Sequence, residues 1–138
     1  MNKNYVFVYG TLMEDEKNHH FLEDCKMVLE CSTEGILFDV FPKPNGFPAM
    51  VEVNADNDID LVFGEVYAVD DVKLKKLDYL ESYTGKKNSM YMRKKRKMMI
   101  EGKMKDVFLY IWNYSTYGLR RFENEGQKWS AESVIKSV

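Results

Sequence analysis

The sequence predicts an α+β fold in which strands outnumber helices. Segments rich in β-branched and aromatic residues recur along most of the chain, whereas one segment alone has a clear helical periodicity. That helix follows several strand-like segments, so the elements lack the regular alternation of strand and helix that a parallel α/β sheet requires. We therefore expect an α+β arrangement.

The sequence of the first third of the chain predicts three strands and one short helix. Residues 5–9 are apolar and aromatic, and Gly10 ends this strand. Residues 16–24 could form a short helix. Residues 27–40 contain two strand-like runs, which we expect to be interrupted near residues 32–33.

The middle of the chain begins with a stiff loop. Residues 41–48 contain three prolines and a glycine, which exclude regular structure. Residues 49–53 are expected to form a strand, residues 54–60 a polar turn and residues 61–69 another strand.

The clearest helix is predicted from Asp71 to Tyr83. Asp70 or Asp71 can accept hydrogen bonds from the free main-chain N–H groups at its start, and negative charge is favourable there. Gly85 could end the helix, since glycine readily adopts the left-handed conformation that follows many helices.

The last third of the chain predicts a hairpin. Residues 91–100 and 107–114 have strand-like composition, and the turn at residues 101–103 contains a glycine between them. Residues 127–136 could form a C-terminal helix.

Length and charge limit the class of protein. The chain has 138 residues, sufficient for one hydrophobic core, and we expect residues 1–138 to form one domain. A net charge of −2 gives no general attraction to nucleic acid or to an anionic membrane. No apolar run approaches the roughly 20 residues of a membrane helix, and the N-terminus lacks a signal-peptide pattern. We expect a cytoplasmic protein without membrane or nucleic-acid partners, and the oligomeric state stays open.

The two cysteines are expected to be reduced. Cys25 and Cys31 lie six residues apart in what should be extended chain, which separates them by about 20 Å. A disulfide needs Cα atoms within about 7 Å.

Glu81 is the principal candidate for a catalytic residue. At about 100° per residue, it falls between Leu74 and Leu77 on the apolar stripe of the predicted helix. Burial disfavours the charged form of a carboxyl, so its pKa would rise to about 6 to 7, where it can accept and return a proton. Asp78 is a weaker candidate at the edge of the same stripe.

A second interpretation of Glu81 gives it no function. The residue could lie solvated at the end of the helix, or it could pair with Lys86 or Lys87.

The turn after the first strand is a candidate anion-binding site. Tyr9, Gly10, Thr11 and Leu12 follow the strand directly, and successive N–H groups in a glycine-containing turn can surround an oxygen anion. A turn that only reverses the chain and binds nothing would have a similar sequence, so this second interpretation stays open. The segment lacks the further glycines and the lysine of a phosphate-binding loop, which disfavours phosphate chemistry.

Five segments together resemble the gamma-glutamylcyclotransferase-like family, in particular its gamma-glutamylamine cyclotransferase branch. They occur in the family's order and with its approximate spacing, and they are residues 8–12, 47–50, 64–67, 77–83 and 91–93.

The resemblance implies a fold, a reaction and a site. The fold would be a mixed-sheet β-barrel with flanking helices. The reaction would release 5-oxoproline and an amine or amino acid from a gamma-glutamyl compound, by attack of its own α-amine. Glu81 would be the general acid and base, the N–H groups of residues 9–12 would hold the substrate, and Tyr110 could line the cavity. The reaction needs no metal and no other cofactor.

Two other functions remain possible from the sequence. The chain could keep the fold and the cavity as a non-catalytic small-molecule-binding or regulatory protein. Alternatively, the basic run at residues 93–97 could serve as a contact patch of an interaction module, although an exposed edge strand explains such a run more simply. His19 and His20 are adjacent, so their side chains diverge, and we expect surface histidines instead of a metal site.

Overall fold

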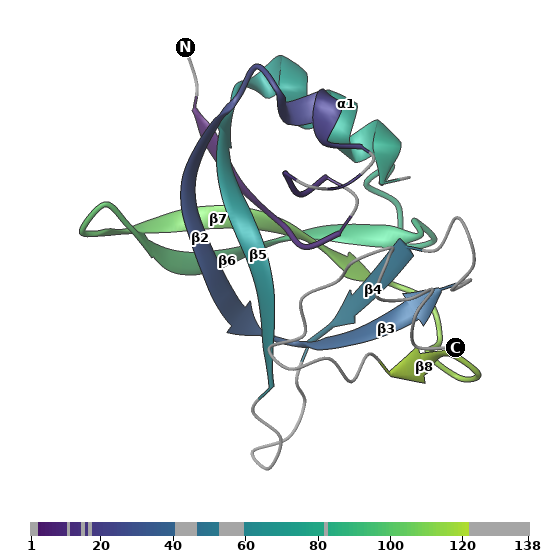
Figure 1. The fold of residues 1–138 in the computed structure, drawn as a ribbon. Coiled ribbons are helices and arrows are strands. Elements are labelled where there is room, and N and C mark those ends of the chain that lie inside the picture. Colours follow the sequence, from purple (N-terminus) through teal and green to yellow (C-terminus); the bar gives the residue numbers. More distant parts are fainter. Residues whose placement is uncertain are drawn as a thin grey trace.

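The computed structural model describes residues 3–10, 12–14, 16, 18–40, 47–52, 60–81 and 83–121. These residues form two β-sheets, one α-helix and one short 3-10 helix (Figure 1). The helices are η1 (His19–Leu22) and α1 (Asp71–Leu80). The strands are β1 (Asn4–Val8), β2 (Lys26–Glu34), β3 (Ile36–Val40), β4 (Phe47–Val51), β5 (Leu61–Val69), β6 (Tyr91–Ile100), β7 (Lys103–Trp112) and β8 (Arg120–Arg121).

The larger sheet is mixed. Its strand order is β2-β5-β1-β7-β6, with β1 parallel to β7 and the other pairs antiparallel. The smaller sheet has the order β4-β3-β8 and is antiparallel. The predicted α+β class with a mixed sheet is thus confirmed. The larger sheet is not the closed barrel that the family resemblance implied, because β2 and β6 lie at its opposite edges and do not pair with each other.

Several predicted boundaries agree with the structure. β5 and β6 have the predicted ends, and Asp70 caps α1 by accepting a 2.7 Å hydrogen bond from the N–H of Lys73. The hairpin is also present, but its turn is tighter than expected and β7 begins at Lys103. Glu101 and Gly102 both have positive φ, 50° and 84°, as the favoured two-residue hairpin turn requires.

Other predicted boundaries are wrong. The helix expected at residues 16–24 is reduced to η1, consistent with its few apolar positions. The interruption expected at residues 32–33 falls at Gly35, because β2 continues pairing with β5 as far as Glu34. α1 ends at Leu80, three residues early, so Gly85 lies in a later turn.

β4 begins earlier than predicted and contains a proline. Pro48 pairs with Asp39 of β3, although residues 41–48 were expected to form a loop. β4 lies at an edge of the smaller sheet, where the missing N–H of a proline is tolerated. Residues 41–46, 53–59 and 127–136 lie outside the described residues. The expectation of one domain over residues 1–138 stays a prediction.

The core is formed mainly by the larger sheet and α1, and the smaller sheet adds Leu37 of β3 and Met50 of β4. The core also includes Phe7 of β1, Val66 of β5 and Leu109 of β7, all fully or almost fully buried. Leu74 and Leu77 of α1 add the predicted apolar stripe of the helix. α1 is therefore fixed against the sheet, with its C-terminal end directed toward the end of β1 (Figure 1).

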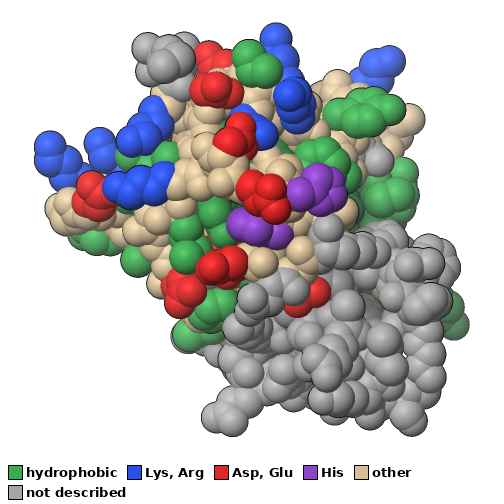
Figure 2. Space-filling view, turned by 45° about the horizontal axis from the view of Figure 1, so that its top comes forward, with side chains coloured by type: hydrophobic (Ala, Val, Ile, Leu, Met, Phe, Trp, Pro, Cys, Tyr) green, Lys and Arg blue, Asp and Glu red, His purple; other side chains and the backbone are tan. Residues whose placement is uncertain are grey.

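The basic run lies on an exposed strand, as expected. β6 is an edge strand of the larger sheet, and the hairpin that it forms with β7 extends away from the body of the molecule (Figure 1). Basic side chains gather at this side of the surface (blue at the left of Figure 2). Lys97 pairs across the hairpin with Asp106 at 2.8 Å, which neutralises part of the run locally. Both cysteines are free, as predicted.

Candidate functional site

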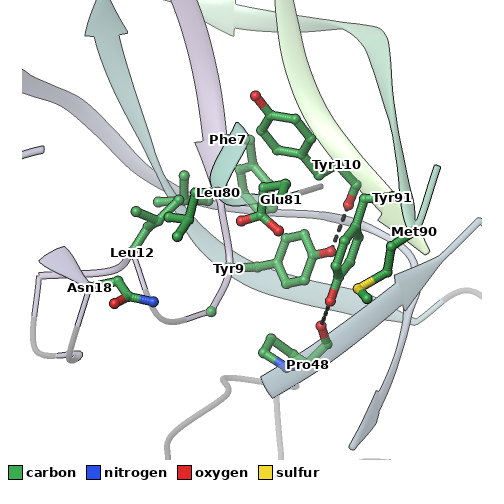
Figure 3. A pocket seen from close by; sticks show the side chains of 12 residues that line it. Phe7, Tyr9, Leu12, Asn18, Pro48, Leu80, Glu81, Met90, Tyr91 and Tyr110 are labelled. Atoms are coloured by element: carbon green, nitrogen blue, oxygen red, sulfur yellow. Dashed lines mark hydrogen bonds between the residues drawn. The ribbon is translucent and has the colours of Figure 1, made fainter. Parts of the chain in front are cut away.

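A pocket of about 230 Å³ opens where β1 ends and α1 ends (Figure 3). Most of its lining is aromatic or apolar. The lining residues are Phe7, Val8, Tyr9, Gly10, Leu12, Asn18, Pro48, Leu80, Glu81, Met90, Tyr91 and Tyr110. The pocket thus combines segments that lie far apart in the sequence.

Glu81 contributes a carboxyl group to this pocket. The residue caps the C-terminal end of α1, and its N–H donates a 2.9 Å hydrogen bond to the carbonyl of Leu77. Its carboxyl lies inside the pocket near the ring of Tyr9 (Figure 3). The residue keeps partial exposure because an open pocket admits water, yet protein surrounds the carboxyl. This burial raises the pKa of Glu81 from 4.5 to about 7.

Two buried tyrosines join the pocket to its surroundings. The hydroxyl of Tyr9 donates to the main-chain carbonyl of Tyr110, and that of Tyr91 donates to the carbonyl of Pro48, each at 2.6 Å. The second bond connects β6 of the larger sheet with β4 of the smaller one. Burial and the nearby negative charge of Glu81 raise the pKa of both phenols, which therefore stay neutral at cellular pH.

Tyr110 lines the pocket with its ring while its hydroxyl is bound elsewhere. That hydroxyl donates a 2.6 Å hydrogen bond to Oδ1 of Asp78. Burial and, to a smaller extent, this hydrogen bond raise the pKa of Tyr110 well above its ordinary value. Oδ2 of Asp78 pairs with Arg93 at 2.7 Å. Asp78, the weaker candidate from the sequence, is thus occupied by two partners and is not among the residues that line the pocket.

The turn after β1 is held by several contacts. The N–H of Met13 donates to the carbonyl of Gly10 at 3.0 Å, and Nδ1 of His19 lies 3.0 Å from the carbonyl of Leu12. The N–H of Glu14 donates to Oε1 of the buried Glu65 at 2.8 Å. His19 is therefore a partly buried residue that contacts the turn, whereas His20 is exposed, as we expected of both histidines.

Most of the predicted site residues lie together. Tyr9, Gly10, Leu12, Glu81 and Tyr110 all line the pocket. The carboxyl of Glu81 is enclosed, so the interpretation of a solvated helix end does not apply.

Thr11, also predicted for the site, lies outside the described residues. Sequence reasoning missed the pocket positions of Asn18 and Met90, for which the sequence offers no signal. Tyr91 could have been found, because it belongs to one of the segments on which the family resemblance is based.

An acidic cluster lies apart from the pocket lining. Carboxylate oxygens of Glu14, Glu30 and Glu65 lie within 4.8 Å of one another. Glu65 already accepts hydrogen bonds from the N–H of Glu14 and from the hydroxyl of Tyr67. Exposed acidic clusters are common without a bound ion, so we assign no metal to this one.

Comparison with known proteins identifies the family. Residues 6–131 match the family described as "Gamma-glutamyl cyclotransferase, AIG2-like". The chain belongs to this family. The resemblance inferred from the sequence is confirmed at the family level, whereas membership in the gamma-glutamylamine branch is only suggested.

Relatives of this cyclotransferase family include a protein of Niallia circulans named gamma-L-glutamyl-butirosin B gamma-glutamyl cyclotransferase. It is 31% identical over 122 residues, which cover 86% of this chain and 73% of that relative. The solved structure of YkqA from Bacillus subtilis has 25% identity and a TM-score of 0.65. The match covers 99% of this chain but 43% of that one, so this chain spans less than half of its length.

A mouse AIG2-like protein shares the fold. Its structure has 23% identity and a TM-score of 0.61, and the match covers 94% of this chain and 90% of the mouse chain. Among the described residues of the present family member, no helix has the length and apolar character needed to span a membrane.

Proposed function

We propose that this chain converts a gamma-glutamyl compound into 5-oxoproline and a free amine, with Glu81 as general acid and base. The observation that carries the proposal is the enclosed carboxyl of Glu81, whose pKa of about 7 lies near cellular pH. A group with such a pKa is present in both protonation states and can accept and return a proton efficiently. Family membership supports a cyclotransferase reaction in general.

The reaction starts from the neutral α-amine of the substrate. Its nitrogen attacks the γ-carbonyl carbon and forms the new C–N bond of a five-membered ring. Glu81 takes the proton that the attacking nitrogen loses. The original amide C–N bond then breaks, and Glu81 returns the proton to the leaving nitrogen. One carboxyl thus serves both steps.

The pocket would hold the substrate folded for this attack. Oriented intramolecular reactions reach effective molarities of about 10⁵ M or more, so holding the amine near the carbonyl provides much of the rate. In the proposal, main-chain N–H groups at residues 9–12 bind the gamma-glutamyl group and stabilise the developing oxyanion. The ring of Tyr110 covers one side of the same pocket.

The size of the pocket supports a small acyl group. Its volume of about 230 Å³ is below the about 300–1,000 Å³ typical of sites for drug-sized ligands. We propose that the gamma-glutamyl group fills it and that the leaving group extends from its mouth. An amine is the leaving group that the suggested branch implies, and the name of the Niallia circulans relative specifies the substrate gamma-L-glutamyl-butirosin B.

The test is a screen of gamma-glutamyl amines and gamma-glutamyl amino acids for release of 5-oxoproline. The best substrate is then assayed with Glu81→Gln, which keeps the size of the side chain but cannot carry the proton. We expect a loss of about 10²-fold or more in kcat, the upper range for a general acid or base being about 10⁴-fold. Glu30→Gln, at an exposed position outside the pocket lining, is the matched control and should be unaffected.

Two results would change the proposal. Unchanged 5-oxoproline release by Glu81→Gln would remove Glu81 from the mechanism. Binding of a gamma-glutamyl compound without turnover by the wild-type protein would favour the non-catalytic small-molecule-binding function on the same fold.

A further inference from the structure

Arg93 of β6 makes three contacts near the end of α1. Its Nη1 donates a 2.7 Å hydrogen bond to Oδ2 of Asp78. Its guanidinium carbon lies 4.6 Å from the ring centroid of Phe108 and 5.4 Å from that of Tyr83. Both distances are within the range of about 6 Å in which a cation is attracted to an aromatic face.

Two of these partners flank Glu81 in the sequence. Asp78 lies three residues before Glu81, and Tyr83 lies two residues after it. The N–H of Tyr83 donates a 2.8 Å hydrogen bond to the carbonyl of Asp78, which closes the chain into a tight loop around the catalytic candidate. Arg93 therefore binds both ends of the segment that carries the carboxyl.

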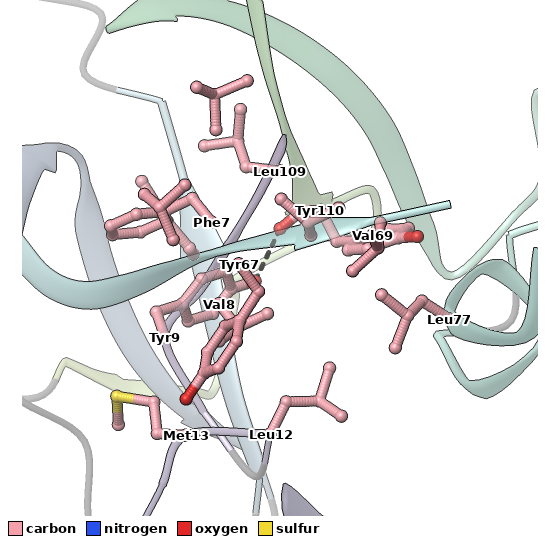
Figure 4. Packing of buried hydrophobic residues seen from close by; sticks show 14 of the residues in the cluster. Phe7, Val8, Tyr9, Leu12, Met13, Tyr67, Val69, Leu77, Leu109 and Tyr110 are labelled. Carbon is pink, nitrogen blue, oxygen red and sulfur yellow. Dashed lines mark hydrogen bonds between the residues drawn. The ribbon is translucent and has the colours of Figure 1, made fainter. Parts of the chain in front are cut away.

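Asp78 also fixes the wall of the pocket. Its Oδ1 accepts the 2.6 Å hydrogen bond from the hydroxyl of Tyr110. Figure 4 shows the side chain of Tyr110 extending from β7 toward the helix that carries Leu77. One carboxylate thus links α1 with β6 through Arg93 and with β7 through Tyr110.

We propose that Asp78, Tyr83, Arg93 and Tyr110 form a clamp that positions the carboxyl of Glu81 in the pocket and limits its access to water. Asp78, Tyr83 and Arg93 are positioning residues that act on the reaction through Glu81, whereas Tyr110 joins the clamp through its hydroxyl and also lines the pocket with its ring. The proposal rests on the proposed function of that residue.

Arginine is suited to this clamp in a way that lysine is not. Its planar guanidinium can donate to a carboxylate and lie on aromatic rings at once, whereas a lysine ammonium is a compact, strongly hydrated point charge. Arg93 is only about one quarter exposed, with a side-chain exposure of 24%, and Asp78 is exposed by 17%. The pair is thus partly shielded from water.

The test compares Arg93→Lys with Arg96→Lys. Arg96 lies on the same strand, donates to Thr33 and to the carbonyl of Glu34, and does not line the pocket. For Arg93→Lys we expect kcat to fall by about 10- to 100-fold with a smaller change in KM, since small displacements of a catalytic group can reduce the rate about 10²-fold. Arg96→Lys should stay within about twofold of wild type.

A second measurement needs no substrate. Titration of ¹³C-labelled glutamate carboxyls by NMR reports the pKa of Glu81 directly. The groups near Glu81 are the phenols of Tyr9, Tyr91 and Tyr110, and lysine at position 93 keeps the positive charge there. A fall of this pKa from about 7 toward 4.5 in Arg93→Lys therefore reports entry of water.

The outcomes separate the clamp from the proposed function. If wild type turns over substrate and Arg93→Lys matches it in both kcat and the pKa of Glu81, the clamp is wrong and the function stands. If wild type has no activity but the pKa still falls in Arg93→Lys alone, the clamp is correct and the function is wrong. Should Arg93→Lys fail to fold, Tyr83→Leu removes the aromatic ring near the Arg93 guanidinium and keeps an apolar side chain against the core. It is expected to lower the same pKa to a smaller extent, and an unchanged pKa would overturn the clamp.

Discussion

Gly10 lies so close to Pro48 that position 10 has no room for a side chain. A Cβ on Gly10 would lie 2.5 Å from Cγ and 2.8 Å from Cδ of the proline ring. Real Cβ atoms essentially never approach other atoms this closely, and a proline ring cannot rotate away as a flexible side chain can. The turn after β1 is thus pressed against β4, and both residues line the pocket.

Gly10→Ala should therefore destabilise the protein and impair the pocket. Inserting a methyl group into a tightly packed site typically reduces the free energy of unfolding by about 1–3 kcal/mol. Urea unfolding measures this loss. The double variant Gly10→Ala/Pro48→Ala lacks the two clashing ring atoms and should recover part of the stability. Equal stability of Gly10→Ala and wild type would show that the contact is looser than the structure indicates.

Glu65→Ala should loosen the turn after β1 from a different side. Glu65 is 5% exposed, and its Oε1 accepts hydrogen bonds from the N–H of Glu14 and the hydroxyl of Tyr67. Leaving the buried hydroxyl of Tyr67 without this partner costs about 1–3 kcal/mol in the free energy of unfolding. Hydrogen exchange at the amide of Glu14 should become faster. Glu30→Ala, at an exposed position of the same acidic cluster, serves as the control and should leave that exchange rate unchanged.

The catalytic rate should depend on pH through Glu81. A base must be deprotonated to accept a proton, and burial places the pKa of this carboxyl at about 7. Below pH 7, protonation of Glu81 should steepen the decline of kcat/KM by about a further tenfold per pH unit, beyond the decline that protonation of the substrate's own α-amine causes. NMR titration of the free substrate identifies any separate inflection from its own α-amine. A rate that stays constant down to pH 5 would contradict the assignment of Glu81 as the base.

Glu81→Gln should be more stable than wild type at pH 8. The pKa of Glu81 is about 7 in the folded state and about 4.5 when unfolded, so the folded state binds the proton more tightly. The free energy of unfolding of wild type therefore falls as the pH rises from about 4.5 to 7, by about 3 kcal/mol in total. Glutamine carries no charge and avoids this loss.

Urea unfolding at pH 4 and pH 8 tests this prediction. The two proteins should have similar stability at pH 4, where the wild-type carboxyl is protonated. At pH 8 Glu81→Gln should be more stable by up to about 3 kcal/mol. A variant that is less stable than wild type at pH 8 would show that the carboxylate is not enclosed in the folded protein.

Local sequence patterns predicted the regular elements well. The β-branched and aromatic run of β5 gave both of its ends, and the capping role of Asp70 followed from its place before an amphipathic segment. The predicted ends were less accurate for strands whose length depends on pairing with another strand. β2 continues to Glu34 because β5 pairs with it there, and β4 takes up Pro48 because β3 pairs with that residue. Neither partner is visible in a local pattern.

The candidate site shows the same difference between what local patterns predict and what depends on strand pairing. Helical periodicity is a local property of the chain, so it predicted Glu81 on the apolar stripe of Leu74 and Leu77, and the structure places Glu81 at the cap directly after α1. Local patterns did not show that the turn at Gly10 and the rings of Tyr91 and Tyr110 line the same pocket as that carboxyl, although the family resemblance implied a shared site for the turn and Tyr110. These groups come from separate strands or the turns beside them, and the pairing of those strands is set by burial of the whole core and not by the residues next to each group.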